Sequence, residues 1–214
     1  MREADHKPDI RPKIGQPSGP SADGLADAAS RAARRGPPPV HLWDPPFCGD
    51  LDIRIARDGT WYYLGTPIGR QPLVKLFASI LKREGHRHFL VTPVEKVGIS
   101  VDDAPFVAVD VRADGDGDGE GRDQTLTVTT NVGDEVSAGA DNPSRVTLDP
   151  TTSEPAPYVH VRRGLEALID RKTFYRIVDL GSEHSLQGVR HFGVWSDGVF
   201  FPFLPSAELE RLSD

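Results

Sequence analysis

The sequence predicts an α+β fold of two lobes, formed by a duplicated unit in which a helix packs on antiparallel strands. Alternating apolar and polar residues flank two Asp-Gly pairs, at positions 58–59 and 197–198, and glycine supplies the positive φ that a tight hairpin turn requires. Two further stretches have the apolar spacing of an amphipathic helix, and each ends at a glycine, Gly85 or Gly181. Helices that pack on hairpins are typical of an α+β fold.

The duplication is predicted from a comparison of the two amphipathic stretches. Each begins with Ile-x-Arg, at Arg70 and at Arg171, and the positions 3, 4, 6 and 7 residues after each arginine are apolar. A His-Phe-x-Val stretch follows at His88 and at His191, so the Arg-to-His spacing is 18 residues in one copy and 20 in the other. Helical spacing alone is common to all amphipathic helices, but the additional matches indicate a repeat. We therefore expect a seam between two lobes, where ligand sites are frequent.

Composition sets the boundaries of the lobes. Residues 1–39 are rich in Pro, Gly, Ser, Ala and charge, so they cannot bury enough apolar surface to offset the entropy lost on folding. We predict a disordered tail there, in which residues 22–35 form a transient helix after an Asp23 N-cap. The predicted parts of the chain are this tail over 1–39, an N-terminal α+β lobe over 40–101, a β-rich C-terminal lobe with one helix over 102–205, and a frayed terminus over 206–214.

The periodicity of apolar residues assigns the elements in chain order. Strands or hairpins are predicted over 51–65, 88–101, 104–113, 124–139, 144–149, 157–162 and 191–205, and helices over 70–85 and 164–181. The stretch "GSEHS" from Gly181 is interpreted as a turn, because a catalytic triad is assembled from distant elements rather than from sequence neighbours.

Charge and cysteine content limit the class of protein. The net charge of −7 argues against a duplex nucleic-acid binder, which needs a basic face. The single cysteine, Cys48, excludes an intrachain disulfide and suits a reducing compartment, and we expect it to be buried as a small apolar residue. No apolar run approaches the roughly 18 residues that span a bilayer, and the N-terminus lacks the apolar core of a signal peptide. We therefore expect a cytoplasmic protein.

The stretch "DGDGDGEGRD" over 114–123 resembles a calcium-binding loop. Its aspartates occupy loop positions one, three and five, and Gly119 occupies position six, as in an EF-hand. Position eight is Gly121 and position twelve is Thr125, so the apolar anchor and the bidentate glutamate are both missing. The flanking residues are strand-like where the motif requires helices. We predict a solvated hairpin loop, no metal site and no cofactor.

The candidate ligand site lies at the expected seam. The segment "TPVEKVGISVDDAPF" brings opposite charges and paired acids close to two turns, and arginines from the second lobe could supply an anion-binding fork. The candidate ligand-binding residues are Arg70, Thr92, Glu95, Lys96, Asp103, Arg162, Arg171 and Trp195, with Arg163 beside them. Structural roles also account for them: turn chemistry and a solvated ion pair around 92–103, ion pairs at the helix starts, and a core position for the tryptophan.

Several motifs resemble those of one bacterial family. They are "DGTWYYLGTPIGRQPLVKLFASILKREG", "FLVTPVEKVGISVDDAPFVAVDV", "TNVGDEV" and "YVHVRRGLEALIDRKTFYRIVDLG", and together they fall within residues 45–205. The chain is similar to the family known as domain of unknown function twelve eighty-five, which has no established activity. The resemblance implies a duplicated α+β core, a C-terminal half similar to a pleckstrin-homology-like fold, and a seam that binds a nucleotide-like ligand in signalling. The long N-terminus and the acidic loop depart from the family pattern.

Three functions from different classes follow from the sequence. The first is a ligand-binding or signalling module, without catalysis, that binds a small anionic or nucleotide-like ligand at the seam. The second is a protein–protein adaptor that acts through the C-terminal lobe, for which an exposed apolar patch or an unpaired edge strand is expected. The third is a hydrolase or transferase with Glu95 or Asp103 as general base, which requires a carboxylate buried enough to raise its pKa.

Overall fold

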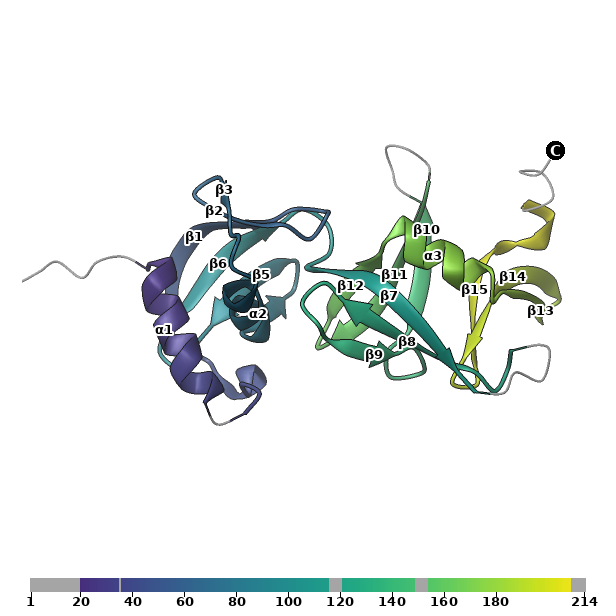
Figure 1. Cartoon of the computed structure of the whole chain (residues 1–214), viewed down its shortest axis with the longest axis horizontal. Helices are drawn as coiled ribbons and strands as arrows, with labels where there is room; N and C mark the ends of the chain where they lie inside the picture. The colour runs from purple at the N-terminus through teal and green to yellow at the C-terminus, as the bar shows by residue number, and fades with distance from the viewer. Residues whose placement is uncertain (1–19, 35, 116–120, 149–153, 209–214) are drawn as a thin grey trace, which may run out of the picture.

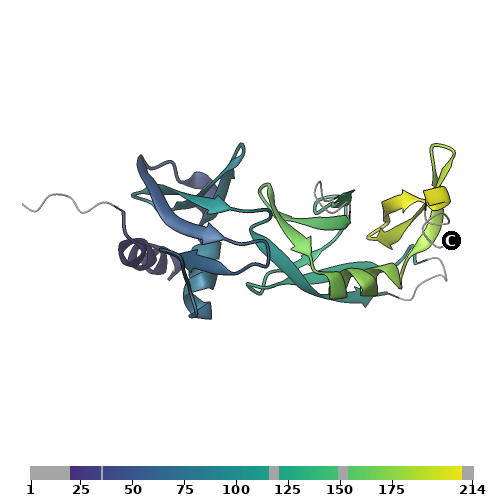
Figure 2. The ribbon, with the colours of Figure 1, turned by 90° about the horizontal axis from the view of Figure 1, so that it is seen from above.

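The structure, a computed structural model, describes residues 20–34, 36–115, 121–148 and 154–208. Two lobes lie side by side along the long axis of the molecule (Figure 1). Residues 102–105 connect them. A smaller three-stranded sheet lies at the end of the C-terminal lobe that is far from the N-terminal lobe (Figure 2). No helix in the described ranges combines the length and the apolarity needed to cross a membrane.

The N-terminal lobe is a six-stranded sheet with two helices. The elements are α1 (Ala22–Ala33), the 3-10 helix η1 (Val40–Leu42), β1 (Phe47–Ile55), β2 (Trp61–Tyr63), β3 (Thr66–Pro67), α2 (Gln71–Ser79), β4 (Leu81–Glu84), β5 (Arg87–Val91) and β6 (Lys96–Val101). The strand order is β3-β2-β1-β6-β5-β4. The pair β1 and β6 is parallel, and every other pair in this order is antiparallel.

The C-terminal lobe contains a second six-stranded sheet, one helix and the smaller sheet. The elements are β7 (Phe106–Asp114), β8 (Thr125–Thr130), β9 (Glu135–Ser137), β10 (Ser144–Leu148), β11 (Pro155–Arg162), β12 (Leu165–Ile169), α3 (Arg171–Val178), β13 (Ser182–Leu186), β14 (Val189–Ser196) and β15 (Val199–Pro205). The six-stranded order is β10-β11-β12-β7-β8-β9, and the smaller sheet has the order β13-β14-β15.

The strand order confirms an α+β fold built from a duplicated unit. In each lobe the first and the sixth strands form the central parallel pair, and the strands on either side are added antiparallel. Strands β1 to β6 therefore correspond one by one to β7 to β12. The two sheets have the same topology, and each half also carries a helix.

The helices do not correspond in the way that the sequence repeat suggested. Helix α2 lies between the third and fourth strands of its unit, whereas α3 follows the sixth strand of the other unit. His88 lies on β5, but His191 lies on β14 in the separate three-stranded sheet. The matched arginines and histidines thus occupy different places in the two copies. Amphipathic spacing is shared by unrelated helices. The duplicated fold was therefore predicted correctly, although the two helical segments that were aligned do not correspond in the structure.

Both predicted helices are too long. Helix α2 ends at Ser79, and residues 81–84 form strand β4, whose turn contains Gly85 at φ 60°. Helix α3 begins at Arg171, because residues 165–169 form β12. The apolar residues of a short buried strand can continue the apolar spacing of the neighbouring helix. Periodicity alone therefore does not show where the strand ends and the helix begins. The predicted turn after Gly181 is strand β13.

Part of the predicted disordered tail is an ordered helix. Helix α1 is N-capped by Ser21, whose side chain accepts a hydrogen bond from Gly24, and not by Asp23. Its apolar stripe, which includes Leu25 and Ala29, is buried against the lobe. Packing supplies the stabilisation that an isolated 12-residue helix lacks. The remainder of the predicted tail, residues 1–19, and of the predicted frayed terminus, residues 209–214, lies outside the described residues.

The core extends through both lobes. Buried apolar side chains from Ala22 to Phe201 form one connected cluster, in which Trp61 and Phe106 are among the largest buried side chains. Cys48, which we expected to be buried, is exposed on β1. One connected core indicates that the lobes are held together as one folding unit.

Side-chain hydrogen bonds also join the lobes. The Nη2 atom of Arg162 donates to the carbonyl oxygen of Ala78 at 3.0 Å, and Nη1 of Arg83 donates to the carbonyl oxygen of Gly164 at 3.0 Å. At a third place, Nδ2 of Asn131 donates to the carbonyl oxygen of Gly59 at 3.2 Å, while its Oδ1 accepts from the amide of Val107 at 3.1 Å.

Candidate functional site

A polar cleft of about 290 Å³ opens at the seam between the lobes. The N-terminal lobe contributes the β4–β5 hairpin, and the C-terminal lobe contributes β10, β11 and β12. The lining residues are Arg83, His86, His88, Val101, Asp103, Ala104, Pro105, Arg145, Thr147, Tyr158 and Glu166. The cleft therefore depends on both copies of the duplicated unit and on the connection between them.

The β4–β5 hairpin places two histidines in the cleft, His86 from its turn and His88 from β5. His86 and His88 line it, whereas Arg87 between them pairs with Asp50 and lies over the ring of Phe89. This division is expected because successive side chains of a strand point to opposite faces.

The floor of the cleft is a hydrogen-bonded network on the outer face of the C-terminal sheet. Arg145 donates to both carboxylate oxygens of Glu166, at 2.9 Å each, and its guanidinium lies over the ring of Tyr158 at 4.4 Å. The Tyr158 hydroxyl donates to Asp103 at 2.8 Å, and Nε of Arg57 lies 3.3 Å from the same carboxylate. Cross-strand register explains the cluster, since Arg145 and Tyr158 face each other across β10 and β11.

The network and the burial change the acidity of three groups. Burial, followed by the hydrogen bond to Asp103, raises the pKa of Tyr158 to about 12. The hydrogen bonds from Arg145 hold the pKa of Glu166 below its usual value. Burial, with the nearby charge of Arg83, lowers the pKa of His88. At neutral pH the cleft therefore contains an ionised glutamate, a protonated tyrosine and a neutral histidine.

Of the residues predicted from the sequence, Asp103 lines the cleft, and Arg162 lies at the contact between the lobes. Arg162 pairs with Asp134 and lies over the ring of Phe106 at 4.9 Å, in addition to its bond to α2. Arg163 beside it is exposed. The role of Arg162 in this structure is to join elements.

The remaining predicted residues lie away from the cleft. The buried Thr92 hydroxyl accepts from the amide of Glu95 at 3.2 Å, which closes the β5–β6 turn. Lys96 pairs with Glu84 at 3.0 Å and lies over the ring of Phe89 at 5.2 Å. The hydrogen bonds from Lys82 and Lys96 lower the pKa of Glu84.

Both helix-start arginines and the tryptophan are also outside the cleft. Arg70 is the exposed residue before α2, and Arg171 at the start of α3 pairs with Glu154 at 3.1 Å. Trp195 lies on the terminal three-stranded sheet, with the ring of His184 at 4.8 Å. Trp195 therefore cannot stack on a ligand held at the seam.

Most residues of the cleft were not predicted from the sequence. The histidine pair at positions 86 and 88 is a His-x-His pattern at a hairpin, and this signal was overlooked. Arg145, Tyr158 and Glu166 lie in ordinary strands, and their proximity depends on cross-strand register. Among the described residues, no group of three or more His, Cys, Asp or Glu side chains is arranged to hold a metal ion. The acidic loop was predicted to bind none, and its residues 116–120 lie outside the described part.

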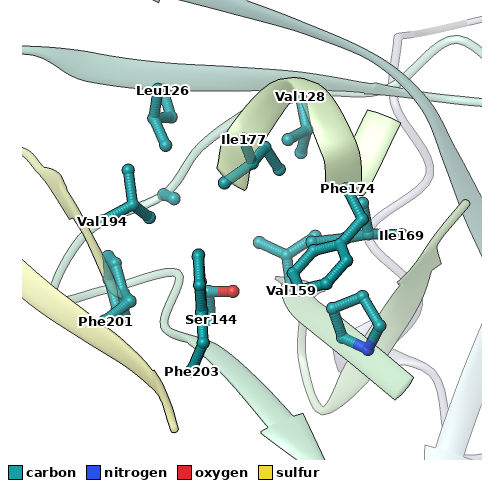
Figure 3. A pocket seen from close by; sticks show the side chains of 12 residues that line it. Leu126, Val128, Ser144, Val159, Ile169, Phe174, Ile177, Val194, Phe201 and Phe203 are labelled. Carbon is teal, nitrogen blue, oxygen red and sulfur yellow. The ribbon is translucent and has the colours of Figure 1, made fainter. Parts of the chain in front are cut away.

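A second, apolar pocket lies inside the C-terminal lobe, between the six-stranded sheet, α3 and the terminal sheet (Figure 3). Phe174, Ile177, Val194 and Phe201 point into it together with side chains of the sheet, and Ser144 contributes a hydroxyl. Its cavity volume of about 20 Å³ is close to that of one water molecule. This pocket is therefore a packing defect of the core rather than a place for a ligand.

Comparisons with known proteins give a consistent result. Residues 38–104 match the family model "Domain of unknown function (DUF1285), N-terminal domain", and residues 105–203 match "Protein of unknown function (DUF1285), C-terminal domain". A crystal structure of a DUF1285 family protein from Silicibacter pomeroyi DSS-3 is 62% identical, covers 89% of this chain and 100% of its own, and has a TM-score of 0.79.

A second crystal structure, of a DUF1285 family protein from Shewanella baltica OS155, is 31% identical, covers 59% of this chain and 90% of its own, and has a TM-score of 0.46. No curated protein matches the chain. The boundary between the two family models, at residues 104 and 105, falls in the connection between β6 and β7.

Proposed function

The chain belongs to the DUF1285 family, and on this premise we propose that it is a ligand-binding or signalling module that binds a small anion in the seam cleft. One observation carries the proposal: four basic side chains from both lobes, Arg83, Arg145, His86 and His88, line the same cleft. Arginine and histidine N–H groups are the common donors to phosphate and carboxylate oxygens. A ligand that contacts both lobes would also change the position of one lobe relative to the other, which is how a signalling module responds to a ligand.

The donors that remain in the cleft support an anion rather than a cation. Arg145 uses Nε and Nη2 for Glu166, and Arg83 uses Nε and Nη1 for backbone carbonyls. The two carboxylates of the cleft are already engaged, Glu166 by Arg145 and Asp103 by Tyr158. A ligand would therefore meet the unused N–H groups of the arginines and the histidine rings.

The same geometry weakens the proposal of a hydrolase or transferase. Glu95 lies in the β5–β6 turn and does not line the cleft, and the carboxylate of Asp103 accepts a hydrogen bond and pairs with Arg57. A general base requires a carboxylate that is free to take a proton from its substrate. Binding without catalysis is the function that these contacts support best.

The cleft also narrows the class of ligand. The face of Tyr158 is covered by the Arg145 guanidinium, and the other lining side chains are aliphatic, polar or charged apart from the histidines. A nucleobase would find no open tyrosine or tryptophan face on which to stack. We therefore propose a small phosphate- or carboxylate-bearing ligand. The reducing compartment that suits one unpaired cysteine makes the cytoplasm the proposed setting.

An adaptor function is a second proposal, supported by one observation. Strand β13 is the outer strand of the terminal sheet, with β14 on its inner side, at the far end of the molecule (Figure 1). An edge strand can accept an extended peptide through its backbone groups. Such binding would be independent of the seam and would survive substitutions in the cleft.

Calorimetric titration of the protein with inorganic phosphate, pyrophosphate and citrate tests the anion proposal. We expect at least one of them to bind, and the double variant His86→Ala/His88→Ala to weaken it about tenfold or more, since two imidazole N–H donors are lost. Arg87→Gln is the matched control, because Arg87 lies in the same hairpin but faces Asp50. Equal loss in the control, or no binding of any anion, would refute the seam site.

A further inference from the structure

Another cavity, of about 220 Å³ and distinct from the small pocket in the core, adjoins the seam cleft. Apolar side chains make up much of its lining, among them Pro155, Pro157, Leu168, Phe174 and Tyr175. Its rim carries charged residues from both lobes. Tyr175 is 58% exposed, which is high for an aromatic side chain and shows that the cavity is open to solvent on the α3 side.

The floors of the two cavities are continuous. Ala104, Ala156 and Tyr158 are buried together as one small cluster, and Leu168 packs against it. Ala104 and Tyr158 line the polar cleft, whereas Ala156 and Leu168 line the apolar cavity. Tyr158 and Leu168 face each other across β11 and β12, and Ala156 lies two residues from Tyr158 on the same face of β11.

One ion pair separates the cavities above this floor. Arg57 lines the apolar cavity, Asp103 lines the polar cleft, and their side chains meet at 3.3 Å. The Arg57 side chain is 50% exposed. An ion pair this exposed adds little net stability, so a ligand can displace it at small cost.

We infer that the ligand is an amphipathic organic anion, with its charged group in the polar cleft and a short apolar group in the adjoining cavity. This inference rests on the proposed function, because it assigns the second half of the same ligand. An alkyl or aryl phosphate or carboxylate has this chemistry. Arg83 and Arg145 bind the head, and Leu168 and Phe174 contact the apolar group.

A series of soluble alkyl phosphates tests the inference. Inorganic phosphate, ethyl phosphate, butyl phosphate and hexyl phosphate are titrated into the full chain by calorimetry. Burial of one methylene contributes about fourfold in affinity when it leaves water completely. We expect affinity to rise by about two- to fourfold for each added methylene, because the cavity is partly open, and then to level off as it fills.

Variants locate the apolar group. Leu168→Ser is expected to flatten the dependence on chain length by about tenfold at hexyl phosphate and to leave the affinity for inorganic phosphate unchanged. Leu180→Ser is the matched control, since Leu180 lies outside both cavities. Ala156→Leu fills the cavity instead of making it polar, so it must give the same flattening even if Leu168→Ser folds poorly.

The outcomes separate this inference from the proposed function. Equal affinity for inorganic and hexyl phosphate overturns the amphipathic ligand and leaves the anion site in place. Failure of every probe to bind removes the anion site itself. Co-sedimentation with vesicles of an anionic phospholipid, without binding of the soluble esters, would overturn a small soluble ligand in favour of a membrane lipid.

Discussion

Replacement of Arg162 by alanine should loosen the contact between the lobes without weakening anion binding. Its hydrogen bond to the Ala78 carbonyl, from a charged donor, contributes about 1.5–3 kcal/mol. The pair with Asp134 is partly exposed, so it adds about 0.5–1 kcal/mol, and the contact with Phe106 adds a similar amount. Because such contributions are not additive, we expect a loss of about 3 kcal/mol, or about 6–12 °C in Tm for a chain of this size.

Differential scanning calorimetry and phosphate titration of the variant measure both effects. The wild-type protein should unfold in one transition, since one core extends through the lobes, and Arg162→Ala should lower or split this transition. Arg163→Ala removes the same charge from the exposed neighbouring position and should change stability by less than about 0.5 kcal/mol. If Arg162→Ala instead left Tm at the control value and abolished phosphate binding, Arg162 would be a ligand residue, as the sequence predicted.

Three further predictions concern single positions. Gly59→Ala should lower the free energy of unfolding, measured by chemical denaturation, by about 2–3 kcal/mol, because φ is +82° and the added Cβ would lie 2.5 Å from Nδ2 of Asn131. Gly65→Ala is the control: its φ is +75° but the added Cβ meets open space, so the loss should be about 1 kcal/mol. Tyr158→Phe should remove the tyrosine that titrates near pH 12 in alkaline absorbance spectra, and an unchanged titration would contradict the network. Because the pKa of Tyr158 is raised in the folded protein, its contribution to the free energy of unfolding is present below pH 10 and is lost as the pH rises from 10 to about 12. The lowered pKa of His88 means that the unfolded chain binds a proton first as pH falls below about 6.5, so the wild type should lose stability from there down to the native pKa, and His88→Gln should lose less.

The sequence was sufficient to predict the class of fold because local patterns agree with it. Asp-Gly pairs at positions 58–59 and 197–198 lie at the hairpins they predict, between β1 and β2 and between β14 and β15. The ends of α2 and α3 were not predictable in the same way, since Leu81 of β4 and the apolar residues of β12 continue the apolar spacing of the adjoining helices. Helix α1 was predicted only as a transient helix, because its stability comes from packing on α2, which composition does not reveal.

The cleft was harder to predict than the fold, because long-range register creates it. Arg145 and Glu166 are 21 residues apart and form their bidentate pair across β11, which lies between their strands. Nothing in the local sequence of either strand indicates that pair. Asp103 lines the cleft because it lies in the connection between the lobes, and a connection must border any seam; its role in ligand binding stays a prediction.

The proposed ligand cleft lies between corresponding strand pairs of the two copies of the unit, β4–β5 in the first and β10–β11 in the second. The shared strand order gives each lobe the same sheet, but α2 is present in one copy between the third and fourth strands and absent from that place in the other. The carbonyl at the end of α2 is where Arg162 of the second lobe binds, and the free outer face of β10, β11 and β12 is where the cleft forms. Duplication thus supplies two similar sheets, and the cleft lies between them. The sequence alignment of the repeat, which matched Arg70 with Arg171, therefore pointed to helix starts, whereas the strand pairs that correspond in the structure, β4–β5 and β10–β11, both line the cleft.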